Sequence, residues 1–165
     1  MEILLEQGNN QNNAAGWRIL FLQAGENGKG IRDIPIGESQ VQGDKFPRPD
    51  IVAGKSAIEY LAIQLQESQD PTSPYHGESG MTLEEWIVAF MAHLEETERP
   101  MDDFGAGNSI VYLTGAFLSA ALDEEAETDR IPTARWYRFD QQAGLFVDEL
   151  NVPSENITVR FAMRA

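Results

Sequence analysis

The chain has 165 residues, no cysteine, two histidines and a formal net charge of −15 at pH 7. A chain without cysteine has no disulfide, no thiolate metal site and no thiol nucleophile. This length predicts a single domain, with a strand and irregular loops in residues 1–53, an acidic helical segment in 54–130, and a β-hairpin plus strand in 131–165.

The negative charge is concentrated in the middle of the chain. Residues 59–129 carry 16 acids and one base, Arg99, and therefore a net charge of −15. The flanking segments, 1–58 and 130–165, have net charges of −1 and +1. Net charge of this kind influences solubility and the choice of partners more than it influences the fold.

The N-terminal part combines short apolar runs with polar tracts. Residues 1–6 and 17–22 are predicted as strands, the second because Trp-Arg-Ile-Leu-Phe-Leu is rich in aromatic and aliphatic residues. The asparagine-rich residues 8–16 and the proline- and glycine-containing residues 24–53 are expected to form loops, with 31–36 as a short edge strand. The first residues lack the basic start and apolar run of a signal peptide, so we expect a cytoplasmic protein.

Two capping boxes predict two helices. Ser56 and Glu59 open the first helix, which Asp70 and Pro71 end. The second begins at Thr82 with Glu85 in the capping box and ends before Pro100. Its apolar positions form one stripe, which consists of Leu83, Trp86, Ile87, Phe90, Met91 and Leu94.

Residues 108–122 are predicted to form a central helix. The run Ile-Val-Tyr-Leu-Thr-Gly-Ala-Phe-Leu-Ser-Ala-Ala-Leu leaves almost no polar stripe at a period of 3.6, as in a helix buried on most sides. Asn108 or Ser109 is expected to cap its start. Phe117 is expected to lie in the core, so that its replacement by alanine would cost about 3 to 5 kcal/mol.

The C-terminal segment has the pattern of β-strands. Residues 135–140 and 145–148 are predicted to form a hairpin with Gly144 near the turn, and residues 157–163 alternate as in a half-buried strand. The order of elements predicts an α+β fold, in which an antiparallel sheet of four or five strands carries about three helices on one face.

No motif in the sequence assigns a catalytic, cofactor-binding or metal-binding residue. Gly54-Lys55-Ser56 lacks the earlier glycine of a phosphate-binding loop, because Pro49 stands at that position. His76 and His93 do not have the spacing of a zinc site. We therefore predict no cofactor, and we regard enzymatic activity as less favoured than binding.

The carboxylates of the middle segment are the strongest functional candidates. Glu84 and Glu95 lie 11 residues apart on the second helix, as do Glu85 and Glu96, and each pair would share a face about 16 Å apart. The sequence has no lysine or arginine within this helix to compensate them. The predicted partner-binding residues are Glu84, Glu85, Glu95, Glu96, Glu98, Asp102, Asp103, Asp123, Glu124 and Glu125.

These observations predict a small acidic, non-enzymatic binding protein that engages a basic protein surface, on a partner that handles nucleic acids. In size and charge the chain resembles phage-encoded anti-defence proteins, DNA mimics and toxin-immunity proteins, so an inhibitor from a phage or mobile element is one interpretation. One alternative is a divalent-metal-dependent carboxylate enzyme acting on a phosphorylated substrate. Another is a structural or assembly protein of a virus or mobile element.

Direct binding to nucleic acid or to a membrane is not predicted. Arg135, Arg138, Arg160 and Arg164 are interleaved with aromatic residues, a pattern found on some nucleic-acid-binding sheets. The segment 130–165 nevertheless holds five bases against four acids, and the whole chain repels phosphate. The oligomeric state is left open.

Overall fold

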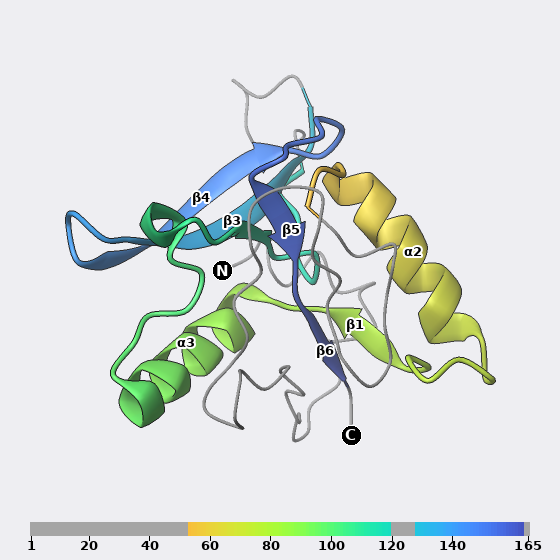
Figure 1. Cartoon of the computed structure of the whole chain (residues 1–165). Helices are drawn as coiled ribbons and strands as arrows, with labels where there is room; N and C mark the ends of the chain where they lie inside the picture. The colour runs from red at the N-terminus through yellow and green to blue at the C-terminus, as the bar shows by residue number, and fades with distance from the viewer. Residues whose placement is uncertain (1–52, 120–127, 164–165) are drawn as a thin grey trace.

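The computed structural model describes residues 53–119 and 128–163 (Figure 1). Four strands form one sheet in the order β4-β3-β2-β5, and β1 and β6 form a separate two-stranded sheet. The fold class is α+β, as predicted. In chain order the elements are α2 (Ala57–Gln69), β1 (Glu78–Gly80), α3 (Leu83–Thr97), the short 3₁₀ helix η4 (Phe104–Ala106), β2 (Ile110–Tyr112), β3 (Arg130–Tyr137), β4 (Gln142–Glu149), β5 (Ile157–Val159) and β6 (Phe161–Met163).

The larger sheet is mixed, whereas the sequence predicted an antiparallel one. Strand β2 pairs antiparallel with β3 and parallel with β5. Strands β3 and β4 form the predicted hairpin, with Arg130 opposite Glu149 at one end and Tyr137 opposite Gln142 at the other. Residues 138–141 make its turn, and Gly144 lies within β4 instead of in the turn.

The two α-helices of the described residues pack on opposite faces of this sheet (Figure 1). Ile110 and Tyr112 of β2 belong to the hydrophobic cluster of α2, and Val111 between them belongs to the cluster of α3. Successive side chains of a strand point to opposite faces, so the two clusters lie on the two sides of the sheet. The prediction of three helices on one face is therefore wrong.

Both helices begin where their capping boxes predict. The Ser56 backbone N–H donates to the Glu59 carboxylate at 2.7 Å, and the Glu59 N–H donates to the Ser56 hydroxyl at 3.4 Å. The Ser56 backbone N–H, followed by the Ser56 hydroxyl, which donates to the same carboxylate at 2.9 Å, lowers the pKa of Glu59. Thr82 and Glu85 repeat the arrangement at 2.7 and 3.3 Å. The two predicted helix starts are confirmed.

The central helix predicted for residues 108–122 is wrong over its described part. Ile110–Tyr112 is strand β2, a turn follows at Thr114 and Gly115, and residues 120–122 lie outside the described ranges. Strand β2 lies between β3 and β5 with all three residues buried. A strand covered on both faces has a continuous apolar run without alternation, so periodicity does not distinguish it from a buried helix. The segment 54–130 is accordingly not all helical.

The strand predicted for residues 157–163 is divided between the two sheets. Strand β5 pairs parallel with β2, and strand β6 pairs antiparallel with β1. Arg160 lies between them and is buried, as are Thr158 and Ala162. The predicted half-buried alternation is therefore wrong, because both sides of this segment are covered.

Several predictions fall outside the described residues. These are the strands at 1–6, 17–22 and 31–36 and the loops around them. Among the helices that the structure does describe, none has the length and apolarity required to cross a bilayer.

Phe117→Ala is now expected to cost about 1 kcal/mol or less, since the side chain is 42% exposed. Urea unfolding of the variant measures this loss. Trp86→Ala is the control, because Trp86 is fully buried in the α3 cluster and its removal is expected to cost about 3 to 5 kcal/mol. Equal losses for the two variants would contradict the packing described here.

Candidate functional site

The outward side of helix α3 combines acidic and apolar residues in one row. Val88 and Met91 are 61% and 57% exposed, and Glu84 and Glu95 are also exposed. These four residues follow one another at spacings of four, three and four, so they lie along one line of the helix. We call Glu84, Val88, Met91 and Glu95 the outer row of α3. Its acids stand about 16 Å apart at its two ends.

The opposite side of α3 makes the core. Trp86 stacks on Phe90 with ring centroids 5.0 Å apart, and Phe90 stacks on Trp136 of β3 at 5.7 Å. Ala89 and His93 are buried on the same side. Ile87 and Met91, which the sequence placed in the core stripe, are exposed instead.

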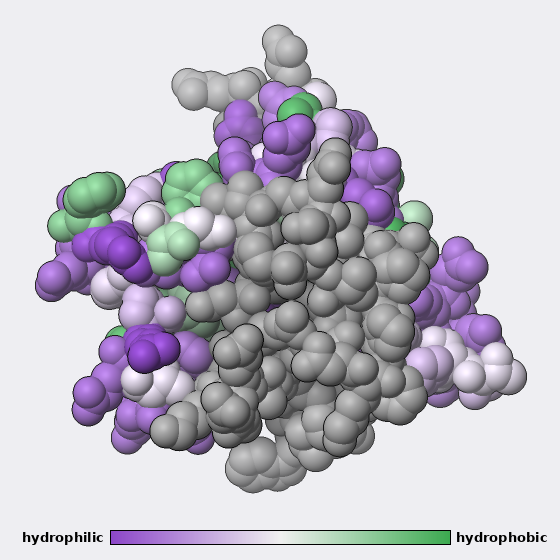
Figure 2. Space-filling view, viewed as in Figure 1, coloured by the Kyte–Doolittle hydropathy of each residue, from purple (hydrophilic) through white to green (hydrophobic). Residues whose placement is uncertain are grey.

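Other acids of α3 differ in their surroundings. Glu96 and Glu98 are exposed, close to the outer row, and Arg99 is the only base nearby in sequence. Glu85 is buried, and its carboxylate accepts the Thr82 N–H at 2.7 Å as part of the capping box. The predicted outward pair of Glu85 and Glu96 therefore does not exist. Hydrophilic residues predominate over the lower left of the molecule, where α3 lies (Figures 1 and 2).

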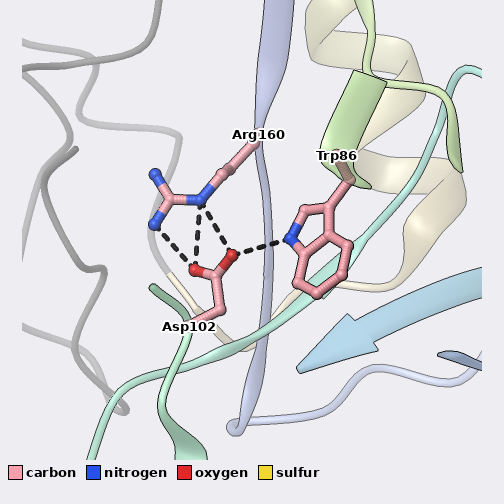
Figure 3. Close-up of polar contacts among 3 residues, drawn as sticks. All are labelled: Trp86, Asp102 and Arg160. Atoms are coloured by element: carbon pink, nitrogen blue, oxygen red, sulfur yellow. Dashed lines mark hydrogen bonds and ion pairs between the residues drawn. The ribbon is translucent and has the colours of Figure 1, made fainter. Parts of the chain in front are cut away.

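Asp102, predicted as part of the acidic surface, is fully buried. Its carboxylate accepts hydrogen bonds from Arg160 Nη2 at 2.7 Å and Nε at 3.1 Å, and from Trp86 Nε1 at 2.9 Å (Figure 3). Its backbone carbonyl accepts the N–H of Trp136 at 2.9 Å. Asp102 thus joins α3, β3 and the β5–β6 connection, and it is not available to a partner.

Asp103 is also engaged within the chain. Its Oδ2 accepts from Arg138 Nε at 3.1 Å and Nη2 at 2.8 Å, and the Asp103 side chain is mostly buried. Arg138 comes from the β3–β4 turn, and its side chain is 56% exposed. Both aspartates were predicted to bind a partner, and no local sequence pattern indicates that Arg138 and Arg160 bind them. The predicted residues Asp123, Glu124 and Glu125 lie outside the described ranges.

Arg135 has a different environment, made of aromatic rings. Its guanidinium carbon lies 4.5 Å from the ring centroid of Tyr137, 4.6 Å from that of Phe146 and 5.7 Å from that of Phe104. In the described part of the chain it forms no ion pair with a carboxylate. Such contacts are cation–π interactions, which stabilise a partly desolvated cation. Of the interleaved arginines, Arg138 and Arg160 bind aspartates and Arg135 contacts aromatic rings, whereas Arg164 lies outside the described residues.

No metal site is visible among the residues described, where no three histidine or carboxylate side chains gather closely enough to hold an ion.

The two buried tyrosines of the α2 cluster, Tyr60 and Tyr112, have a pKa above the ordinary value of tyrosine, so their hydroxyl groups stay protonated at neutral pH. Burial raises the pKa of Tyr112 to about 12, and the Asp148 carboxylate and Tyr60 contribute to the rise. Burial likewise raises the pKa of Tyr60.

Comparison with known proteins finds no matching family model, no similar curated protein and no similar solved structure. The surface chemistry of the chain is therefore the basis for a functional proposal. Of the predicted partner-binding residues that the structure describes, Glu84, Glu95, Glu96 and Glu98 are exposed. They lie on or just after α3, beside exposed Val88 and Met91.

Proposed function

We propose that this protein is a small acidic binding protein, not an enzyme, that uses the outer row of α3 to engage a basic surface of a protein partner. The observation that carries the proposal is the outer row itself, in which two exposed apolar side chains lie between two exposed glutamates. An ordinary solvated helix face would carry lysines or arginines four residues from its glutamates, and α3 has none.

The chemistry of the outer row specifies a partner surface with an apolar centre and a basic rim. Val88 and Met91 supply contact area that leaves water on binding, and methionine adapts its shape to irregular partners. Glu84 and Glu95 at the ends would meet lysine or arginine. Charges at such a rim mainly speed association and select against acidic partners.

A partner that handles nucleic acid fits this arrangement. The separation of Glu84 and Glu95 corresponds to about five phosphate steps of a DNA strand. A basic groove that binds DNA phosphates would therefore meet two carboxylates whose separation matches a spacing of phosphates measured along the DNA axis. The proposed role is that of an inhibitor that occupies a nucleic-acid site, as expected of an anti-defence, DNA-mimic or immunity-type protein.

The test removes charge from the outer row without touching the core. We expect Glu84→Gln with Glu95→Gln to reduce the association rate with a captured partner by about tenfold at low salt, because the rim charges steer the encounter. Partners are captured from a host lysate on the immobilised protein, identified by mass spectrometry, purified, and measured by surface plasmon resonance. The binding of the parent chain should weaken between about 0.05 and 0.3 M NaCl.

The matched control removes two exposed charges elsewhere, with Asp140→Asn and Glu155→Gln. Its association rate should stay within about twofold of the parent, since only the overall charge changes. Equal effects of the two double variants would show that the net charge, and not the outer row, attracts the partner. Binding that is indifferent to salt would also contradict the proposal.

A further inference from the structure

Strand β4 lies at the edge of the four-stranded sheet, and among the described strands none pairs with its outer side. Eight consecutive residue pairs join it to β3 without a bulge. Soluble proteins usually protect an edge strand with a lysine, a proline, a bulge or a short length. The sequence of β4, Gln-Ala-Gly-Leu-Phe-Val-Asp-Glu, contains no lysine or proline, and its charged residues, Asp148 and Glu149, stand together at its C-terminal end.

The middle of β4 is apolar and open to solvent. Leu145, Phe146 and Val147 are each 42% to 43% exposed, and Phe139 in the adjoining turn is 96% exposed. Hydrophobic groups are visible over the β3–β4 hairpin at the left of the molecule (Figure 2). Three consecutive apolar side chains place apolar surface on both faces at this edge, where a neighbouring strand would supply cross-strand contacts on each face.

From these observations we propose that two copies of this chain associate through β4, so that the four described strands of each copy form one continuous sheet. A second copy is the simplest occupant, because the same apolar triplet serves both sides of an antiparallel pair. The two-fold axis of such a dimer is perpendicular to the sheet, so residues directly opposite one another belong to the same face. This condition is met only when one residue of β4 lies opposite the same residue of the second copy. The residue before it then lies opposite the second copy's residue after it.

The register centred on Phe146 uses the apolar triplet fully. Phe146 then faces Phe146 of the second copy, and Leu145 faces its Val147 on the other side of the sheet, twice by symmetry. Asp148 and Glu149 fall opposite Gly144 and Ala143, so no acid stands against an acid. The contacts place apolar groups in the centre and acids at the two ends of the interface.

Charge complementarity also favours this register. Arg135 lies directly opposite Gly144 across the β3–β4 ladder, and it has no carboxylate partner in the described part of the chain. Gly144 has no side chain, and the rings of Tyr137 and Phe146 occupy the space where a Cβ would lie. This register places the second copy's Asp148 in the same row and on the same face as Gly144 and Arg135, beyond the two rings; within its own chain that carboxylate accepts a hydrogen bond from the Thr133 hydroxyl at 2.9 Å. The dimer therefore adds a negative charge beyond the aromatic rings that surround each Arg135.

The dimer surface is separate from the proposed partner surface. The outer row of α3 belongs to a helix, whereas β4 is the far edge of the sheet (Figure 1). The two surfaces should respond oppositely to salt. Two chains of charge −15 repel each other, so salt strengthens their association, while salt weakens binding of a basic partner.

Sedimentation velocity of the full chain tests the association. A single strand pair buries an area at the low end of the range found in protein–protein interfaces. We therefore expect a dimer that forms between about 10 and 200 µM in about 0.3 M NaCl. Val147→Lys should abolish it, because lysine on an edge strand blocks pairing. Val88→Lys makes the same change at an exposed position of α3 and should leave the dimer intact.

These outcomes decide the proposal and keep it distinct from the proposed function. A chain that remains monomeric at about 200 µM, or a dimer that Val147→Lys leaves intact, overturns the β4 dimer. Partner capture that Val88→Lys weakens and Val147→Lys does not would support the outer row of α3 independently. Loss of one property therefore does not imply loss of the other.

Cysteine cross-linking tests the register, and the cysteine-free chain makes the result specific. Residues opposite each other in an antiparallel pair have Cα atoms about 4.5 to 5.5 Å apart, within the range of a disulfide. Phe146→Cys alone should form a covalent dimer on mild oxidation. Leu145→Cys and Val147→Cys should cross-link when mixed and much less when each is alone. Cross-linking of Leu145→Cys with itself, in place of the mixed product, overturns the register.

Discussion

Asp102→Asn is expected to lower the free energy of unfolding by about 3 to 5 kcal/mol, because it leaves the buried Arg160 guanidinium without its counter-charge. Arg160 is 3% exposed and Asp102 is fully buried, so water cannot take over the lost interaction. Asparagine retains the shape of the side chain and accepts the left-handed backbone of Asp102, whose φ is 53°. The loss of unfolding free energy therefore measures the removal of the negative charge and not a change in backbone strain.

The neighbouring aspartate is the matched control. Asp103→Asn removes the partner of Arg138, whose side chain is 56% exposed and can be solvated, so the expected loss is about 1 kcal/mol. Chemical unfolding monitored by tryptophan fluorescence compares the two variants. Adding Arg160→Met to Asp102→Asn should recover part of the stability, since a buried unpaired cation is removed. Equal losses at Asp102 and Asp103 would show that the buried pair contributes little.

The parts of the fold that were predictable are those encoded by neighbouring residues. Ser56 with Glu59 and Thr82 with Glu85 satisfy backbone groups within three residues, so their sequence alone locates the helix starts. The hairpin of β3 and β4 is also local. In contrast, the strand at Ile110–Tyr112 depends on β3 and β5 on its two sides, and no local pattern records that both its faces are covered.

The same distinction explains the acidic site. Glu84 and Glu95 are exposed, as predicted, but the start of a helix does not fix which side faces the core, since Glu85 of the same helix is buried. From the sequence, Asp102 and Asp103 were predicted to continue the acidic surface of α3. Their arginine partners are 58 and 35 residues away in sequence, so only the tertiary structure brings them together. Net charge by segment therefore overestimated the acidic surface.

Gly115→Ala is expected to lower the free energy of unfolding by about 3 kcal/mol or more. Gly115 donates its N–H to the Met81 carbonyl at 3.0 Å, where the chain leaving β1 passes the turn after β2. A Cβ at Gly115 would lie 2.5 Å from the Gly80 carbonyl oxygen and 2.8 Å from the Met81 carbonyl carbon. Both contacts are to backbone, so no side-chain rotation relieves them.

The clash also reaches the core of α3. Met81 and Leu113 flank the contact and are fully buried in the α3 cluster, so separating the two backbones opens a gap between them. Gly77→Ala is the control, because a Cβ there meets no atom within 4 Å but the φ of 81° is unfavourable for alanine. That variant should lose about 1 kcal/mol, the cost of the backbone alone. A loss at Gly115 that does not exceed the loss at Gly77 would mean that β1 can move away from the turn without disturbing the packing of α3.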